Sequence, residues 1–122
     1  MSRRIERVND LLQEQLSELI QREMKDPRLA GLISVTRVET AQDLRNARVY
    51  VSVLGSDEEK EAALRALKSA EPFLRRGLRE RVTMHHIPAL HFRRDESMAE
   101  AARVLALMRQ VQEERQEKDS PE

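Results

Sequence analysis

The sequence predicts a single α+β domain in which one small sheet is covered on one face by helices. Three observations predict this class. Apolar residues recur at helical spacing near the start of the chain, short β-branched runs follow, and helical patterns return in the second half. A chain of 122 residues has room for one domain with one core, and it contains no internal repeat.

The first predicted element is an amphipathic helix with one buried face. Its apolar residues are spaced three or four positions apart: Ile5, Val8, Leu12, Leu16, Leu19, Ile20 and Met24. Pro27 ends this helix, because a proline disfavours the helical conformation in the residue before it. Core packing is the expected role of its apolar face.

Two strands are predicted next, over residues 32–40 and 47–53. The first departs from strict alternation, which is typical of a strand with a β-bulge. The second alternates cleanly between apolar and polar residues. Because residues 41–46 form a short polar linker, we expect an antiparallel hairpin with one buried face.

A second helix begins at Ser56, which has the spacing of a capping box with Glu59. Pro72 then interrupts a helical pattern that otherwise continues to Leu78. A proline inside a helix costs about 3 kcal/mol unless the helix kinks or restarts. We therefore predict two short helices joined at residues 69–72.

The rest of the domain is predicted as a strand over residues 82–92 followed by a terminal helix. Pro88 indicates that this strand lies at an edge or is broken. Ser97 and Glu100 have the spacing of a second capping box. The apolar residues of the terminal helix share one side: Ala101, Leu105, Met108 and Val111. We divide the chain into a globular domain, residues 1–112, and a charged flexible tail, residues 113–122.

Composition argues against several classes of function. The chain has no cysteine, so it has no disulfide, thiolate metal site or cysteine nucleophile. Only Tyr50, Phe73 and Phe92 are aromatic, too few for the base-stacking platforms of many RNA-binding domains. No glycine-rich phosphate loop or catalytic motif is present. We expect a protein that is not an enzyme and needs no cofactor.

His85, His86 and His91 lie in or beside the last predicted strand, and Asp95 is the nearby carboxylate. A zinc site needs convergent ligands, and Pro88 disturbs the register that would align these side chains. We expect surface histidines and no metal site. The N-terminus is charged rather than apolar, and no stretch approaches the roughly 20 apolar residues of a membrane span. A cytoplasmic protein is expected.

The clearest functional signal is a basic block from Arg65 to Arg94, which holds eight Lys/Arg and two Glu in a chain of net charge zero. One concentrated basic block in a neutral chain indicates a face for a polyanion, with nucleic acid the first to test. On a helical projection, Arg75, Arg76 and Arg79 lie opposite the apolar side. We expect them to lack acidic partners on their own helix. A merely solvated face is the alternative.

The predicted RNA-binding residues fall into two groups. The basic block supplies Lys68, Arg75, Arg76, Arg79, Arg81, Arg93 and Arg94. The footprint is extended by Arg3, Arg4, Arg7, Arg28 and Arg45, each a weak signal by itself.

The chain resembles the ribosome-binding factor A family, bacterial assembly factors for the small ribosomal subunit. Two matching motifs are specific in combination: Lys-Asp-Pro-Arg-Leu at residues 25–29 and Pro-x-Leu-x-Phe-x-x-Asp at residues 88–95. Further matches run in order along the globular part: Arg7-Val8, Arg22-Glu23-Met24, Val38-Glu39, Asp43-Leu44, residues 47–52, Phe73-Leu74-Arg75 and Glu96-Ser97.

The resemblance implies a type II KH-like fold, with a kinked helix pair in place of the Gly-x-x-Gly loop of ordinary KH domains. The kink falls on Ala70, Glu71 and Pro72, with proline where glycine is usual in the family. His85, Ala89, Arg93 and Arg94 also depart from the family's usual residues.

The resemblance further implies a non-enzymatic factor that binds the free small subunit and assists late rRNA processing and assembly. It implies a monomer whose partners are the small subunit and its rRNA, with other assembly factors as further candidates. No membrane contact is expected. The alternative is a protein-interaction module that docks on an acidic partner without RNA.

Overall fold

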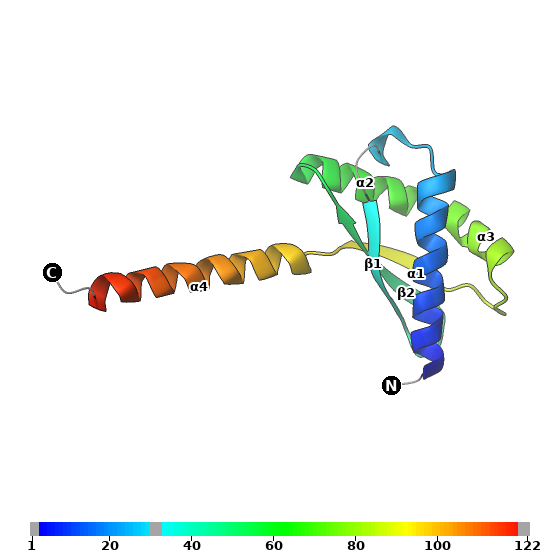
Figure 1. The fold of residues 1–122 in the computed structure, drawn as a ribbon. Helices are drawn as coiled ribbons and strands as arrows, with labels where there is room; N and C mark the ends of the chain where they lie inside the picture. Colours follow the sequence, from blue (N-terminus) through cyan, green and yellow to red (C-terminus); the bar gives the residue numbers. More distant parts are fainter. Residues whose placement is uncertain (1–2, 30–32, 120–122) are drawn as a thin grey trace.

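The protein is represented by a computed structural model that describes residues 3–29 and 33–119. A three-stranded sheet carries helices α1, α2 and α3 on one face, and a fourth helix, α4, projects away from this body (Figure 1). The predicted α+β sandwich is therefore confirmed. The core lies between the sheet and the three helices.

Helix α1 (Arg3–Glu23) buries the face that its periodicity predicts, including Leu12, Leu16 and Leu19. It packs on β1 and α3. The helix ends before Pro27, as expected, and a short 3-10 turn, η1 (Pro27–Leu29), follows.

Strands β1 (Ile33–Thr40) and β2 (Asn46–Val53) pair antiparallel, which confirms the hairpin. The register shifts between Val35 and Arg37, where the sequence indicated a bulge. Residue 32 of the predicted strand lies outside the described residues. In the connecting turn, Leu44 has a φ of 61°, in the left-handed region that a non-glycine residue seldom adopts.

Helix α2 (Asp57–Ser69) begins with the predicted capping box. The Ser56 hydroxyl accepts the amide of Glu59 at 3.2 Å, and the Glu59 carboxylate accepts the amide of Ser56 at 3.0 Å. The hydrogen bond from the Ser56 backbone is the main reason that the pKa of Glu59 is lowered.

A single residue, Ala70, separates α2 from α3 (Glu71–Arg81), so the predicted break is confirmed. Ala70 has φ −87°, a conformation open to any residue, and the kink therefore does not need a glycine. Pro72 lies in the first turn of α3, where its missing amide hydrogen costs little. Proline at this position is compatible with the family's kink.

Close contact between α1 and α3 depends on Gly77. A Cβ atom built on Gly77 would lie 2.8 Å from Cδ2 of Leu19, a side chain with no exposed surface. The inner side of α3 is therefore tightly packed, while its opposite side faces solvent.

The predicted strand over residues 82–92 is partly wrong. Strand β3 (Ala89–Arg94) begins only after Pro88 and runs parallel to β2 at the edge of the sheet. Val82 and Ile87 are buried without strand pairing, because this segment crosses from the end of α3 back to the start of β3. The buried apolar residues of such a crossover segment give the same sequence pattern as a strand.

Helix α4 (Ser97–Asp119) differs most from expectation. The predicted Ser97 capping box is wrong: the helix starts at Ser97, whose amide and hydroxyl donate to Asp95 at 2.9 and 2.5 Å. The helix also continues past residue 113, where we expected it to end, to Asp119; residues 120–122 of the predicted tail lie outside the described residues. Its apolar residues are exposed, including Leu107 at 61% and Met108 at 62%. The division into a domain and a flexible tail stays a prediction.

Candidate nucleic-acid interface

The outer side of α3 presents two free cations. Leu74 and Leu78 face the core, whereas Arg76 and Arg79 are exposed. Neither arginine takes part in an ion pair within residues 3–29 and 33–119. We call Arg76 and Arg79 the arginine face.

Arg75 does not belong to this face. Its Nη2 lies 2.9 Å from Oε1 of Glu71, one helical turn earlier. Oε2 of the same carboxylate accepts the backbone amide of Leu90 at 2.9 Å. The expectation that the α3 arginines lack acidic partners is therefore wrong for Arg75. Glu71 joins the start of α3 to the edge strand, and Arg75 neutralises it.

Arg81 ties α3 to α1. Its guanidinium lies 2.9 Å from Glu18 and 3.4 Å from Glu23, both on α1. These partners are about 60 residues away in the sequence, so a local charge pattern could not reveal them.

Arg94 is held by three carboxylates. Its nitrogens lie 2.9 Å from Glu61, 2.9 Å from Glu96 and 3.3 Å from Asp57. The hydrogen bond to Glu61 is the main reason that the pKa of Arg94 is raised. This arginine links the end of β3 to α2.

Arg28 pairs with Asp26 at 2.7 Å within the turn that follows α1. The Arg28 side chain is the main reason that the pKa of Asp26 is lowered. Arg28 thus closes a local turn inside the Lys-Asp-Pro-Arg-Leu motif.

Lys68 and Arg93 lie on either side of a shallow groove of about 330 Å³ between the end of α2, the kink and β3. Glu71 and Phe92 also line it. Both cations are exposed, and neither forms an ion pair in the described ranges. This groove adds two free cations beside the helix pair.

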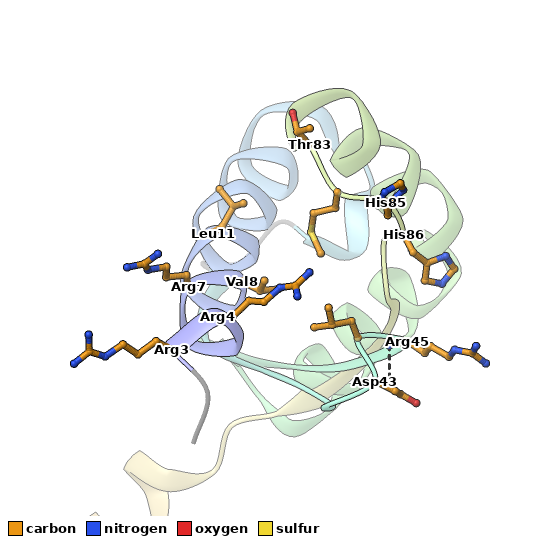
Figure 2. Close-up of a pocket in the computed structure, with 12 residues that line it drawn as sticks. Arg3, Arg4, Arg7, Val8, Leu11, Asp43, Arg45, Thr83, His85 and His86 are labelled. Atoms are coloured by element: carbon orange, nitrogen blue, oxygen red, sulfur yellow. Dashed lines mark hydrogen bonds between the residues drawn. The ribbon is translucent and has the colours of Figure 1, made fainter.

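The remaining predicted arginines gather at the other end of β3. Arg3, Arg4 and Arg7 of α1 and Arg45 of the hairpin line one open cleft of about 1010 Å³, which we call the N-terminal cleft (Figure 2). A local sequence pattern could not group them, because Arg45 lies 38 residues after Arg7.

His85 and His86 line the same cleft from the α3–β3 loop, and sequence reasoning did not connect them with the arginines. His91 lies apart on β3, with Nε2 2.9 Å from Oδ1 of Asn46. The described residues contain no group of three or more His, Cys, Asp or Glu placed to hold a metal ion.

Asp95, the carboxylate considered with the histidines, instead anchors the first turn of α4. Oδ2 accepts the hydroxyl of Thr36 at 2.5 Å, and Oδ1 accepts the Ser97 hydroxyl. These hydrogen bonds, led by that of Ser97, lower the pKa of Asp95 to about 2. None of the described helices is long and apolar enough to span a bilayer.

The sequence and the fold match known proteins along most of the chain. The family model for ribosome-binding factor A matches residues 4–108. A ribosome-binding factor A of Thermomicrobium roseum is 49% identical over 114 residues, which cover 93% of this chain and 88% of the relative.

A crystal structure and a fitted homology model are also similar in fold. The crystal structure of ribosome-binding factor A from Thermus thermophilus has a TM-score of 0.67 at 36% identity and covers 74% of this chain and 93% of its own. The second is a homology model of the Thermus factor, which was fitted into a cryo-electron microscopy map of a 30S complex with that factor. Its TM-score is 0.61 at 36% identity, and the match covers 72% of this chain and 91% of the Thermus chain.

These matches confirm the type II KH-like fold that the resemblance implied, with the helix–strand–strand–helix–helix–strand order of residues 3–94. The family model covers most of the chain, and the sequence identity to the Thermomicrobium relative, 88% of which is covered, is 49%. The chain therefore belongs to the ribosome-binding factor A family.

Proposed function

We propose that this protein binds the free small ribosomal subunit through its rRNA and assists late rRNA processing and subunit assembly. The observation that carries the proposal is the likeness to the Thermus factor, 36% identical, whose model was fitted into a map of a 30S complex. The protein acts in the cytoplasm as a monomer and catalyses no reaction.

The arginine face and the groove beside it supply the phosphate contacts. Arg76, Arg79, Lys68 and Arg93 are exposed cations without intramolecular ion pairs in the described ranges, so contact with phosphate breaks no existing interaction. Such contacts position a protein on RNA and carry little sequence information. Specificity then comes from the folded shape of the rRNA, which the kinked helix pair fits.

The four predicted RNA-binding arginines that form ion pairs have a different role in this mechanism. Arg28, Arg75, Arg81 and Arg94 each engage carboxylates of the same chain. We assign them to holding the RNA-binding surface in shape rather than to contacting RNA directly.

Sedimentation of the full-length tagged protein with ribosomal particles tests the proposal. We expect it to migrate with free small subunits and not with whole ribosomes. The logarithm of the binding constant should fall with the logarithm of salt concentration, with a slope of about −0.7 to −0.9 per phosphate contacted. Failure to bind small subunits, or binding insensitive to salt, contradicts the proposal.

The role in processing needs a cellular measurement. Removal of the protein should cause precursor forms of the small-subunit rRNA to accumulate, and the wild-type chain should restore mature rRNA. Normal processing in cells that lack the protein contradicts this part. A nuclease-resistant complex without rRNA favours the alternative, docking on an acidic protein.

A further inference from the structure

The N-terminal cleft is built from three segments that are distant in the sequence. They are the first turns of α1, the β1–β2 turn and the α3–β3 loop. Figure 2 shows Arg4 reaching from α1 into the opening, while Arg3 and Arg7 project from the outer side of that helix. His85, His86 and Arg45 lie on the opposite side, where the Arg45 guanidinium and the His86 ring point away from Arg4. The backbone amide of Ala89 donates to the carbonyl of Arg45 at 2.9 Å and fixes the hairpin against the loop.

The rim of this cleft carries an excess of positive charge. Four arginines line it, and none forms an ion pair within residues 3–29 and 33–119. The acidic residue on the wall is Asp43, whose carboxylate already accepts the amide of Arg45 at 2.9 Å. Several unneutralised cations around a concave surface concentrate the positive potential and attract polyanions.

The floor of the cleft is apolar, unlike the arginine face. Val8, Leu11, Leu44 and Met84 contribute to its lining, and Leu44 holds its side chain there from a left-handed backbone conformation. A simple phosphate ion has no apolar surface to bury in the cleft, whereas a nucleobase has a large flat apolar surface. Imidazole rings, such as those of the two histidines, stack on exposed bases in RNA recognition.

We propose that the N-terminal cleft binds a short unpaired RNA segment. Arg4 and Arg45 contact its phosphates, and His85 and His86 with the apolar floor contact its bases. Paired RNA does not fit this role, because the bases of a duplex are stacked inside the helix and cannot reach the floor. The inference rests on the proposed function, since rRNA is the partner there. Beyond that function, the protein then has a second RNA-binding site, which prefers single-stranded segments.

Binding of a fluorescent single-stranded RNA hexamer of mixed sequence to the full-length protein tests the site. Two charge reversals in the cleft, R4E and R45E, should weaken binding at least about tenfold, because each removes a cation and adds an anion beside phosphate. The matched control reverses Arg103 and Arg109, both exposed on α4, and should change affinity less than about twofold. An equal loss of hexamer affinity in the cleft variant and in the control variant overturns the proposal.

The base contacts need a separate variant. H85A combined with H86A should weaken hexamer binding at least about fivefold, as expected for loss of stacking on a base. The same variant should have the affinity of the wild type for a polyphosphate that carries the same charge as the hexamer. Unchanged hexamer affinity overturns the assignment of bases to this cleft. Polyphosphate or polyglutamate binding as tight as hexamer binding also overturns it, because the cleft would then be a general anion site.

Failure of this inference can be distinguished from failure of the proposed function. If the cleft variant binds the hexamer normally while the wild type still sediments with small subunits, the cleft assignment is wrong and the function stands. If the wild type does not bind small subunits, the proposed function is wrong whatever the hexamer does. All substituted side chains are exposed, and a thermal melt of each variant checks its fold.

Discussion

The arginines predicted to bind RNA divide into two sets in the structure. The paired set forms ion pairs within the chain: Arg28, Arg75, Arg81 and Arg94. The unpaired set forms none among the described residues: Arg3, Arg4, Arg7, Arg45, Arg76, Arg79 and Arg93. The basic block therefore overstates the charge available to a ligand, because carboxylates of the same chain neutralise part of it.

The two sets also differ in what their removal should do. Arg81 and Arg94 link separate elements, and Arg75 neutralises a carboxylate that does so, so their loss should lower stability. An unpaired arginine on the surface contributes little to folding, so its loss should change only binding.

The largest effect on stability is expected at Glu71. Its side chain is 14% exposed, and its carboxylate accepts hydrogen bonds from Arg75 and from the amide of Leu90. Glu71→Ala should lower the free energy of unfolding by about 2–3 kcal/mol, because it leaves a partly buried amide and a guanidinium unpaired. Urea unfolding measures this. Glu80→Ala, an exposed change on the same helix, should stay within about 0.5 kcal/mol of wild type.

A smaller effect, with a pH signature, is expected at Asp95. Hydrogen bonds hold its pKa at about 2, below the usual value of 3.8. A carboxyl whose pKa is lowered by folding stabilises the protein fully above its unfolded value and loses that contribution as pH falls. Stability should therefore drop between pH 4 and pH 2, and Asp95→Asn should flatten this part of the profile.

At neutral pH, Asp95→Asn should lower the free energy of unfolding by about 1–2 kcal/mol, because Thr36 and Ser97 lose a charged acceptor. Parallel pH profiles for the variant and the wild type would show that Asp95 does not stabilise the fold in this way.

The smallest stability effect separates two neighbouring arginines of α3. Arg81→Gln should lower the free energy of unfolding by about 0.5–1 kcal/mol, since it breaks an ion-pair link to α1. Arg79→Gln should change it by less than about 0.5 kcal/mol. Thermal unfolding at low and high salt checks both, because screening should remove the difference. A persistent difference at high salt would mean that packing, not charge, accounts for it.

Much of the fold could be predicted because it is encoded locally. The periodicity of α1, the capping box at Ser56 and the break before Pro72 each involve neighbours in the sequence. The position of α4 could not be predicted in this way. Leu105 and Met108 repeat at the same spacing as the buried leucines of α1, yet they remain exposed. Periodicity shows that a helix has an apolar side and does not show whether another element covers it.

The candidate site was predicted only in part for a related reason. Arg76 and Arg79 were recognised because their helix has one apolar side. The ion pairs of Arg81 could not be predicted, because its partners, Glu18 and Glu23, lie on α1. The N-terminal cleft was missed because it forms only when the hairpin and the α3–β3 loop meet α1. Ion pairs and clefts between distant segments can be identified only once the tertiary fold is known.

The most direct measurement is the affinity of the full-length protein for purified free small subunits over a range of salt concentrations. Reversal of the arginine face, R76E with R79E, should weaken binding at least about tenfold and reduce the salt slope by nearly two. The same reversal of Arg103 and Arg109 on α4 should leave the affinity and the salt slope unchanged. Equal loss in the two variants, or no loss in either, would contradict the claim that the unpaired arginines of α3 contact rRNA.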